Sequence, residues 1–196
     1  DFETVTRTQV GDAIGMFYGY ETEGLFQSQQ DILDHAVQVP SPGDANQNFI
    51  DKRDGIWLGD VKFKDQNGDG IIDSKDQVIV GDPNPLSTFG LNNKFKYGNF
   101  DLAVYLVGTY GADIFNFQRY RNESMLSSYN NQSTTVANRA QFEMIDPNGS
   151  ETDINNWAYV NPGTDIPRFS QLNVNGNARM SDRWIEDGSF LRIQNV

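Results

Sequence analysis

The stretch from Thr88 to Tyr110 constrains the fold most strongly, because a single strand register sorts its side chains into two unlike faces. A two-residue type II′ turn at Gly98-Asn99, with glycine first, sets that register. On one face it pairs Tyr97 with Phe100, Phe95 with Leu102, Asn93 with Val104, and Leu91 with Leu106. On the other it pairs Lys96 with Asp101, Lys94 with Ala103, and Asn92 with Tyr105. The first face is apolar except for Asn93 and the second is mostly polar, so the stretch predicts a long antiparallel hairpin in an all-β fold.

Two structures fit such a hairpin. Each strand has about the ten residues with which a tilted strand crosses a bilayer, and aromatic residues flank the tight turn, as at the periplasmic rim of an outer-membrane barrel. In that case Phe89, Leu91, Phe95, Leu102, Val104 and Leu106 face lipid, while Lys94, Lys96, Asp101 and Tyr105 face the lumen or a plug. A soluble β-sandwich with one buried face gives the same pattern, and the hairpin alone does not decide between the two.

A second feature is the acidic run DQNGDGIIDSKD at residues 65–76, whose spacing matches an EF-hand calcium loop. The ligands expected from this spacing are the side chains of Asp65, Asn67 and Asp69, the carbonyl of Ile71, Asp73 directly or through water, and Asp76. Gly70 permits the sharp turn, and Ile72 anchors the loop to apolar neighbours. All candidate ligands are hard oxygens, which favours Ca²⁺. Asp76 stands where a longer Glu is usual, and an acidic turn without metal is the alternative.

The flanks of this loop are strand-like rather than helical. Residues 61–64 alternate before it, residues 77–80 are short and β-branched after it, and prolines at 83 and 85 stop any helix. There is one copy of the loop, whereas calcium sensors and dockerins use pairs. We therefore expect one structural Ca²⁺ between extended segments rather than a calcium switch.

Composition excludes several classes of function. The chain has 196 residues and a net charge of −12, which argues against nucleic acid as a partner. It has no cysteine and one histidine, His35, which we expect at the surface, so thiolate sites and imidazole-based triads are not expected. No G-x-S-x-G motif is present and no carboxylate pair can be placed at catalytic separation, so we expect no enzyme activity. No run approaches ~18 apolar residues, although barrel strands give a much weaker signal than helices.

The remaining chain predicts short elements and one long polar segment. Residues 27–37 fit a short helix capped by Ser28 or Asp31. Residues 114–182 show little regular pattern apart from a short helix in 134–143, as expected for a functional loop that is extracellular on a barrel. The aromatics Trp157, Tyr159 and Trp184 are expected to pack locally rather than to stack on sugars. Residues 189–196 begin a further strand, and the chain has neither an initiator Met nor a signal peptide, so we expect it to be cut from a longer protein.

Several motifs together resemble the SusC/RagA family of TonB-linked outer-membrane proteins. They are residues 17–27 (FYGYETEGLFQ), 59–70 (GDVKFKDQNGDG), 80–85 (VGDPNP), 161–168 (NPGTDIPR) and 181–192 (SDRWIEDGSFLR), and they keep the family's order over nearly the whole chain. The resemblance implies that residues 1–196 are a late segment of a 22-stranded transmembrane antiparallel β-barrel with long extracellular loops. The plug domain and the TonB-interacting segment then lie outside this chain.

The resemblance also implies a function. Members of the family import oligosaccharides, and sometimes peptides, across the outer membrane of Bacteroidetes together with a SusD-like surface lipoprotein. The alternative from another class is a secreted calcium-stabilised β module, dockerin-like or carbohydrate-binding. Such a module explains the acidic loop, but it does not explain a two-faced hairpin of bilayer length.

Overall fold

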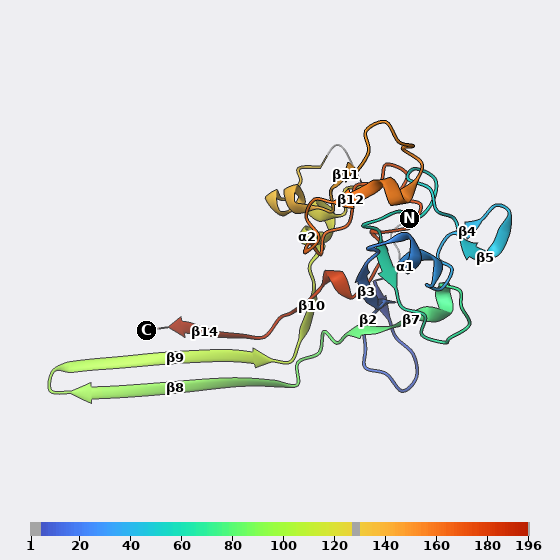
Figure 1. Ribbon diagram of the computed structural model, residues 1–196. Coiled ribbons are helices and arrows are strands. Elements are labelled where there is room, and N and C mark those ends of the chain that lie inside the picture. Colours follow the sequence, from blue (N-terminus) through green and yellow to red (C-terminus); the bar gives the residue numbers. More distant parts are fainter. Residues whose placement is uncertain (1–4, 127–129, 196) are drawn as a thin grey trace.

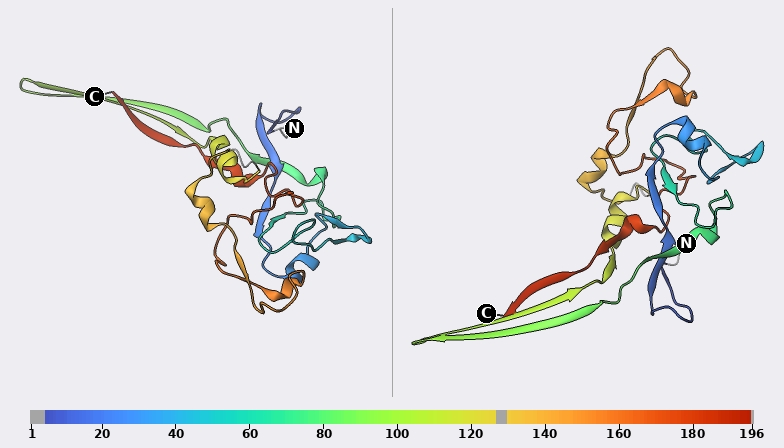
Figure 2. Two further views of the ribbon diagram at one scale, coloured as in Figure 1. Left: turned by 90° about the horizontal axis from the view of Figure 1, so that it is seen from above. Right: turned by 60° about the horizontal axis from the view of Figure 1, so that its bottom comes forward.

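The computed structural model describes residues 5–126 and 130–195, which form a body and a long arm (Figure 1). The body comprises residues 5–86 and 111–188, and the arm is a three-stranded sheet that extends away from it. Figure 2 shows from two further directions that two of the arm strands form a long hairpin and that the third lies beside the part of the hairpin nearest the body. Strands dominate the described residues and the two α-helices are short, which confirms the predicted all-β class.

The core of the arm is the predicted hairpin. Strands β8 (Ser87–Tyr97) and β9 (Phe100–Tyr110) have 11 residues each and pair from Tyr97↔Phe100 to Ser87↔Tyr110 without a shift. Every predicted pair is present. Gly98 has a φ of 58° and Asn99 is not among the described residues with positive φ, as a type II′ turn requires. The register of this hairpin was therefore encoded locally.

The third strand of the arm is β14 (Phe190–Asn195), which pairs with β9 and confirms the strand predicted for 189–196, Val196 lying outside the described residues. The strand order is β14-β9-β8. Leu191 stands opposite Gly108 and Ile193 opposite Leu106, so both extend the apolar face of the hairpin.

That apolar face lies open in the described structure. The exposed fraction is 60% for Phe95, 48% for Leu102 and 61% for Ile193. Further exposed apolar side chains of this face are Phe89, Leu91, Tyr97, Phe100 and Leu191. An exposed surface of this kind, apolar except for Asn93, marks an interaction with another protein or with a membrane.

The body is built from small sheets. One joins β2 (Met16–Tyr20) to β1 (Thr6–Arg7) and β7 (Gln77–Gly81). A second pairs β3 (Thr22–Leu25) with β6 (Val61–Phe63). The remaining pairs are β4 (Pro40–Ser41) with β5 (Asp44–Asn48), β10 (Asp113–Phe115) with β13 (Ile185–Asp187), and β11 (Phe142–Met144) with β12 (Trp157–Tyr159).

Short helices connect these sheets. Helix α1 (Gln29–Leu33) begins after Ser28, whose hydroxyl accepts a hydrogen bond from the Asp31 amide, so the predicted helix and its cap are confirmed. Helix α2 (Phe117–Glu123) is capped in the same way by Asn116. The 3₁₀ turns are η1 (Ser74–Asp76), η2 (Thr134–Asn138), η3 (Ile154–Asn156) and η4 (Asp182–Trp184). None of the helices within the described ranges is long and apolar enough to cross a membrane.

The core of the body lies where these sheets meet. One cluster contains Tyr20, Leu25, Val61, Phe63, Ile72 and Ala140. A neighbouring cluster contains Phe26, Ile32, Ile56, Trp57, Leu58 and Ile154. Ala140 and Ile154 come from the long segment 114–182, so this segment contributes to the core rather than only covering it.

The segment 114–182 is therefore more regular than its sequence pattern predicted. It contains α2, η2, β11, η3 and β12, and η2 provides the helical turn predicted for its middle. The segment also buries Val136 and Ile166. Its placement outside the membrane stays a prediction.

The aromatic residues of this region pack locally, as predicted. Trp184 is 1% exposed. The Tyr159 hydroxyl donates to the carbonyl of Phe26 at 2.7 Å, and the Trp157 ring N–H donates to the carbonyl of Glu151 at 3.1 Å. The prediction for His35 was wrong, because its side chain is only 11% exposed and its ring meets the Phe26 ring edge-on at 5.2 Å. Helix α1 ends just before His35, and the chain after the helix places the His35 ring against Phe26 of the core. The local sequence did not indicate this contact.

Candidate functional site

The acidic loop 65–76 connects β6 to β7, so the strands predicted on both sides of it are confirmed. Asp65 accepts hydrogen bonds from the amides of Gly68 and Gly70, at 2.7 and 2.8 Å. Both glycines have positive φ, 74° and 82°, which side chains rarely adopt. The sharp turn expected at Gly70 is therefore present, and it is shared with Gly68.

Inside the turn the side chains accept backbone hydrogen bonds in sequence. Asn67 Oδ1 accepts from the Asp69 amide at 2.8 Å, and Asp69 Oδ1 accepts from the Ile71 amide at 3.0 Å. The Ile71 hydrogen bond is the largest cause that lowers the pKa of Asp69, so this carboxylate stays ionised. These bonds hold the candidate ligands at the front of the loop in one turn.

The rear of the loop is fixed to the body. Asp76 is fully buried, and its two oxygens accept from the amides of Gln66, at 3.0 Å, and Asp73, at 2.7 Å. Asp73 in turn caps η1 through the Lys75 amide at 2.7 Å. Ile72 is 6% exposed in the core, which confirms its predicted role as an anchor. Asp76 thus has a structural task that the spacing argument did not predict.

The residues present suit a hard cation in part. No group of three or more His, Cys, Asp and Glu side chains in the described ranges lies close enough together to hold a metal ion by itself. Lys75 forms ion pairs with two of these carboxylates: its ammonium lies 3.5 Å from Asp69 Oδ2 and 3.2 Å from Asp73 Oδ2. The oxygen-only donor set, completed by Asn67 and the Ile71 carbonyl, is the set that Ca²⁺ prefers. Calcium at residues 65–76 stays a prediction.

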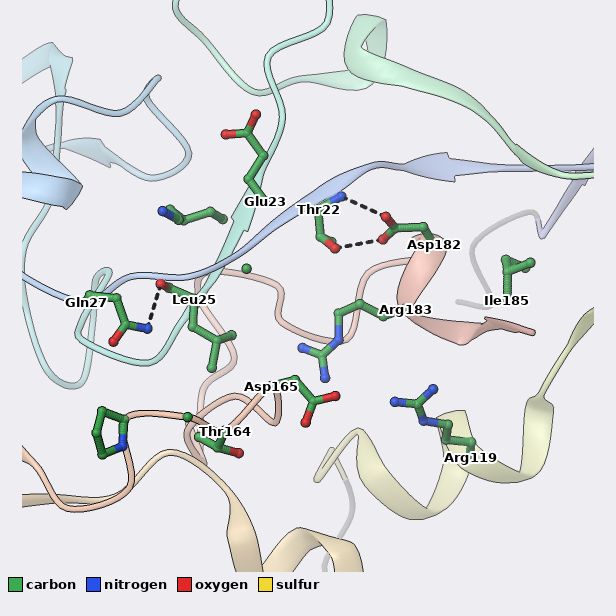
Figure 3. A pocket seen from close by; sticks show the side chains of 14 residues that line it. Thr22, Glu23, Leu25, Gln27, Arg119, Thr164, Asp165, Asp182, Arg183 and Ile185 are labelled. Carbon is green, nitrogen blue, oxygen red and sulfur yellow. Dashed lines mark hydrogen bonds between the residues drawn. The ribbon is translucent and has the colours of Figure 1, made fainter. Parts of the chain in front are cut away.

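A second candidate site is a cavity of about 590 Å³ in the body (Figure 3). Its walls come from β3, the 162–165 turn, Arg119 of α2, and Asp182 and Arg183 of η4. Asp182 is held in place by Thr22, whose hydroxyl and amide donate to its carboxylate at 2.8 and 3.2 Å. In Figure 3 the side chains of Arg183, Asp165 and Arg119 converge on the same space.

The two arginines of this cavity differ in their partners. Arg119 forms ion pairs with Glu123 at 2.9 Å and with Glu186 at 3.4 Å. Arg183 Nη1 is buried and has no hydrogen-bond partner among the residues that the structure describes. Burial, followed by repulsion from Arg119, lowers the pKa of Arg183 to about 10. The charge of Arg183 is therefore only partly compensated by its surroundings.

A buried polar network holds the distant parts of the body together. Asp60 is fully buried and accepts from Arg168 Nε at 2.8 Å, from Arg168 Nη2 at 2.9 Å and from Asn177 Nδ2 at 2.8 Å. Arg168 also donates to the carbonyl of Lys52 at 2.6 Å. Gln38 joins the network by donating to Asn175 Oδ1 at 2.7 Å. This network fixes residues 168–177, in the last part of the 114–182 segment, against Asp60 and β6.

The chain is similar to known proteins over nearly all of its length. It is 32% identical over 191 residues, 97% of its length, to TonB-dependent receptor P26 of Formosa agariphila. It is 28% identical over 95% of its length to TonB-dependent receptor P3 of the same organism. It is 31% identical over 68% of its length to TonB-dependent receptor SusC of Bacteroides thetaiotaomicron. No protein-family model matches the chain.

The chain is a segment of a SusC-like TonB-dependent receptor. It spans 16%, 15% and 11% of the lengths of these three relatives. Receptors of this family reside in the outer membrane of Gram-negative bacteria, so the segment belongs to an outer-membrane protein.

These relatives confirm the resemblance that the motifs indicated. The structure also shows which site residues the sequence predicted and which it missed. Residues 65–76 form one turn as predicted. The partners Asp60 and Arg168 were not predicted, although both stand inside the motifs that carried the resemblance. One signal could have indicated that Asp60 is buried and paired: it is a charged residue next to apolar residues such as Val61, which are buried.

Proposed function

We propose that this receptor segment supplies part of the wall of a transmembrane β-barrel, 22-stranded as in the family it resembles. The observation that carries the proposal is the arm. Its strands β8 and β9 have 11 residues each, close to the roughly 9–11 residues of a transmembrane strand. Its apolar face is exposed in the described structure and its opposite face carries Lys94, Lys96 and Asp101.

The edges of the arm support the same proposal. Among the described residues, β8 pairs only with β9, and β14 pairs only with β9. In a bilayer each unpaired backbone N–H or C=O costs several kcal/mol, so only closed barrels place strands there. The remaining length of the receptor supplies the neighbouring strands, and lipid covers Phe89, Leu91, Phe95, Leu102, Val104 and Leu106.

Cysteine labelling tests the orientation of the arm. The segment has no cysteine, so single cysteines at Leu102 and Lys94 can carry nitroxide labels in the full-length receptor, provided its remaining cysteines are replaced. We expect oxygen, which concentrates in lipid, to relax the label at Leu102 more strongly. A water-soluble nickel chelate should relax the label at Lys94. Equal access of the chelate to both positions contradicts the proposal.

For the whole protein we propose import of a bulky polar nutrient, an oligosaccharide or a peptide, in a TonB-linked process. The plug, the TonB-contacting segment and the contact with a SusD-like lipoprotein are expected to involve residues outside the arm. The named relatives support a transporter, and no turnover of the nutrient is expected from this segment. Growth of a strain lacking the receptor gene on a panel of glycans and peptides provides the test. Unchanged growth on every nutrient would refute import.

Within this function the loop 65–76 binds one structural Ca²⁺, through Asp65, Asn67, Asp69, the Ile71 carbonyl and Asp73, with Asp76 holding the loop from behind. The hydrogen bonds already position the front oxygens, and the ion would neutralise their mutual repulsion. A secreted calcium-stabilised module is not favoured, because the relatives are receptors and an apolar arm of this length is a liability in water.

A further inference from the structure

The body carries its most exposed apolar side chains at one place, the end where it joins the arm. Among the large apolar side chains described in the body, the three with the highest exposed fractions are Val10 at 104%, Ile14 at 80% and Leu86 at 79%. Leu86 directly precedes β8, and the other two belong to the loop of residues 8–15 between β1 and β2. Single exposed apolar residues are ordinary, whereas a group of them indicates an interaction surface.

The direction of the strands places loop 8–15 at the end of the body nearest the arm. Strand β7 leads through residues 82–86 into β8, so the chain there runs towards the arm. Strand β2 is antiparallel to β7, with Phe17 opposite Gly81, so the start of β2 is its end nearest the arm. The loop that precedes this start lies at the same end, and Figure 1 shows it in dark blue below β2 and β7.

A hydrogen bond fixes the loop next to the start of the arm. Asn84 Nδ2 donates to the Ile14 carbonyl at 3.1 Å. The loop is also closed on itself, because the Thr8 hydroxyl accepts from the Gly15 amide at 3.0 Å. Loop 8–15 is therefore a turn with a defined position beside the residues that lead into β8.

The position of Asn84 gives the height of the loop relative to the membrane proposed for the arm. Asn84 stands three residues before Ser87, the first residue of β8, so it lies no more than roughly 10 Å from the start of that strand. A strand tilt of roughly 35–45° reduces this distance to about 7–8 Å along the membrane normal. The headgroup layer on each side of a bilayer is roughly 5–8 Å thick. The loop therefore lies at the level of the headgroups.

The opposite end of the arm also has strongly exposed apolar side chains. Tyr97 and Phe100, beside the hairpin turn, are 87% and 80% exposed. At the body end, Tyr110 closes β9 and is 61% exposed. Transmembrane strands carry such aromatic residues at both membrane surfaces. Loop 8–15 adds aliphatic side chains at the level of the second of these surfaces.

We propose that loop 8–15 inserts Val10 and Ile14 into the lipid interface beside the arm, and so attaches the body to the membrane surface. The boundary between headgroups and acyl chains covers apolar side chains at this depth, whereas the lumen of a barrel is polar. The proposal rests on the proposed function in one respect, namely that the arm crosses a bilayer.

Spin labelling of the full-length receptor in lipid vesicles tests this contact. Single nitroxide-labelled cysteines are placed at Ile14 in the loop, at Ala45 in the β4–β5 hairpin and at Leu102 in the arm, after the receptor's own cysteines are replaced. Ala45 is exposed, and its hairpin lies away from the arm in Figures 1 and 2. We expect the ratio of oxygen to nickel-chelate collision rates to be several-fold higher at Ile14 than at Ala45.

A substitution in the loop tests whether its apolar character causes this difference. Val10→Asp adds a charge without disturbing the core, because the Val10 side chain is fully exposed. With the label at Ile14, it should lower the collision ratio several-fold, towards the value at Ala45. Gln47→Asp places the same charge on the exposed strand β5 and is the matched control, which should leave the ratio at Ile14 unchanged.

Three results overturn the proposal. High chelate access at Ile14 places the loop in water. Low access of both oxygen and the chelate shows that another part of the receptor or a partner protein covers the loop. An unchanged ratio in Val10→Asp shows that the apolar side chains do not hold the loop in lipid.

The label at Leu102 separates these failures from a failure of the proposed function. Chelate access at Ile14 together with oxygen access at Leu102 rejects the contact of the loop with lipid and retains the barrel wall. Chelate access at Leu102 rejects the membrane-spanning arm, and the contact proposed for the loop falls with it.

Discussion

Replacing Asp60 by Ala should destabilise the body of the receptor strongly, because it removes the anion at the centre of the buried polar network. The Asp60 carboxylate accepts four hydrogen bonds, two from Arg168 at 2.8 and 2.9 Å, one from Asn177 and one from the Trp57 amide, both at 2.8 Å. Asp60 is fully buried and Arg168 is 7% exposed. Its loss leaves the Arg168 charge buried without its anion, for which about 3–5 kcal/mol is typical.

Hydrogen exchange is the suitable assay, because a large membrane receptor does not unfold in one reversible step. Two amides report on the network directly: Arg168 N–H, bonded to the Gly59 carbonyl at 2.9 Å, and Val61 N–H, bonded to Asn177 Oδ1 at 2.9 Å. An opening free energy lower by 3–5 kcal/mol corresponds to exchange that is roughly 150- to 5,000-fold faster. Peptides covering both amides should show this acceleration in Asp60→Ala.

Two further variants sharpen the test. Asp54→Ala removes a carboxylate that is 61% exposed and 4.0 Å from Arg53, so its effect should stay within about 0.5 kcal/mol. In Asp60→Ala combined with Arg168→Met the unpaired charge is gone, and exchange should be slower than in Asp60→Ala alone. Two results would show that the network does not stabilise the body. One is amide exchange in Asp60→Ala that is no faster than in Asp54→Ala. The other is exchange that is faster in the double variant than in Asp60→Ala.

Three other changes give separate tests. Asp69→Ala, or removal of calcium with a chelator, should accelerate exchange across residues 65–76 without disassembling the barrel, and a receptor in which neither treatment matters speaks against the ion. Leu102→Arg should destabilise the receptor in lipid by about 2–4 kcal/mol if it lies near the midplane, whereas Lys94→Gln should be nearly neutral; equal effects in a denaturant titration reject the lipid assignment. Hydrogen bonds from Gln66 and Lys64 lower the pKa of Glu21 below 4.5. The hydrogen bond between Glu21 and Gln66 therefore stabilises the loop above pH 4.5, and this stabilisation is lost as the pH falls through the lowered pKa. Exchange in the loop should rise over that acidic window, and Glu21→Gln should show no such rise.

The sequence alone determined the parts of this receptor whose partners are close in the chain. The hairpin register follows from a two-residue turn and an alternating pattern, because a slip by one residue would exchange its two faces. The Ser28 cap and the turn at Gly68 and Gly70 likewise depend on hydrogen bonds within a few residues. The family followed from motifs whose order along the chain is visible without a structure.

Only the tertiary structure decided how the body is held together and where its unsatisfied charge lies. Asp60 and Arg168 are 108 residues apart, and Gln38 and Asn175 are 137 apart. Such contacts leave no periodic pattern, because each partner sits in an irregular segment whose neighbours do not report on it. The same holds for His35, which the sequence placed at the surface but whose ring contacts the Phe26 ring in the structure. It also holds for Arg183. The environment of Arg183 is assembled from β3, α2, the 162–165 turn and η4, and its missing partner becomes apparent only once these four parts are in place.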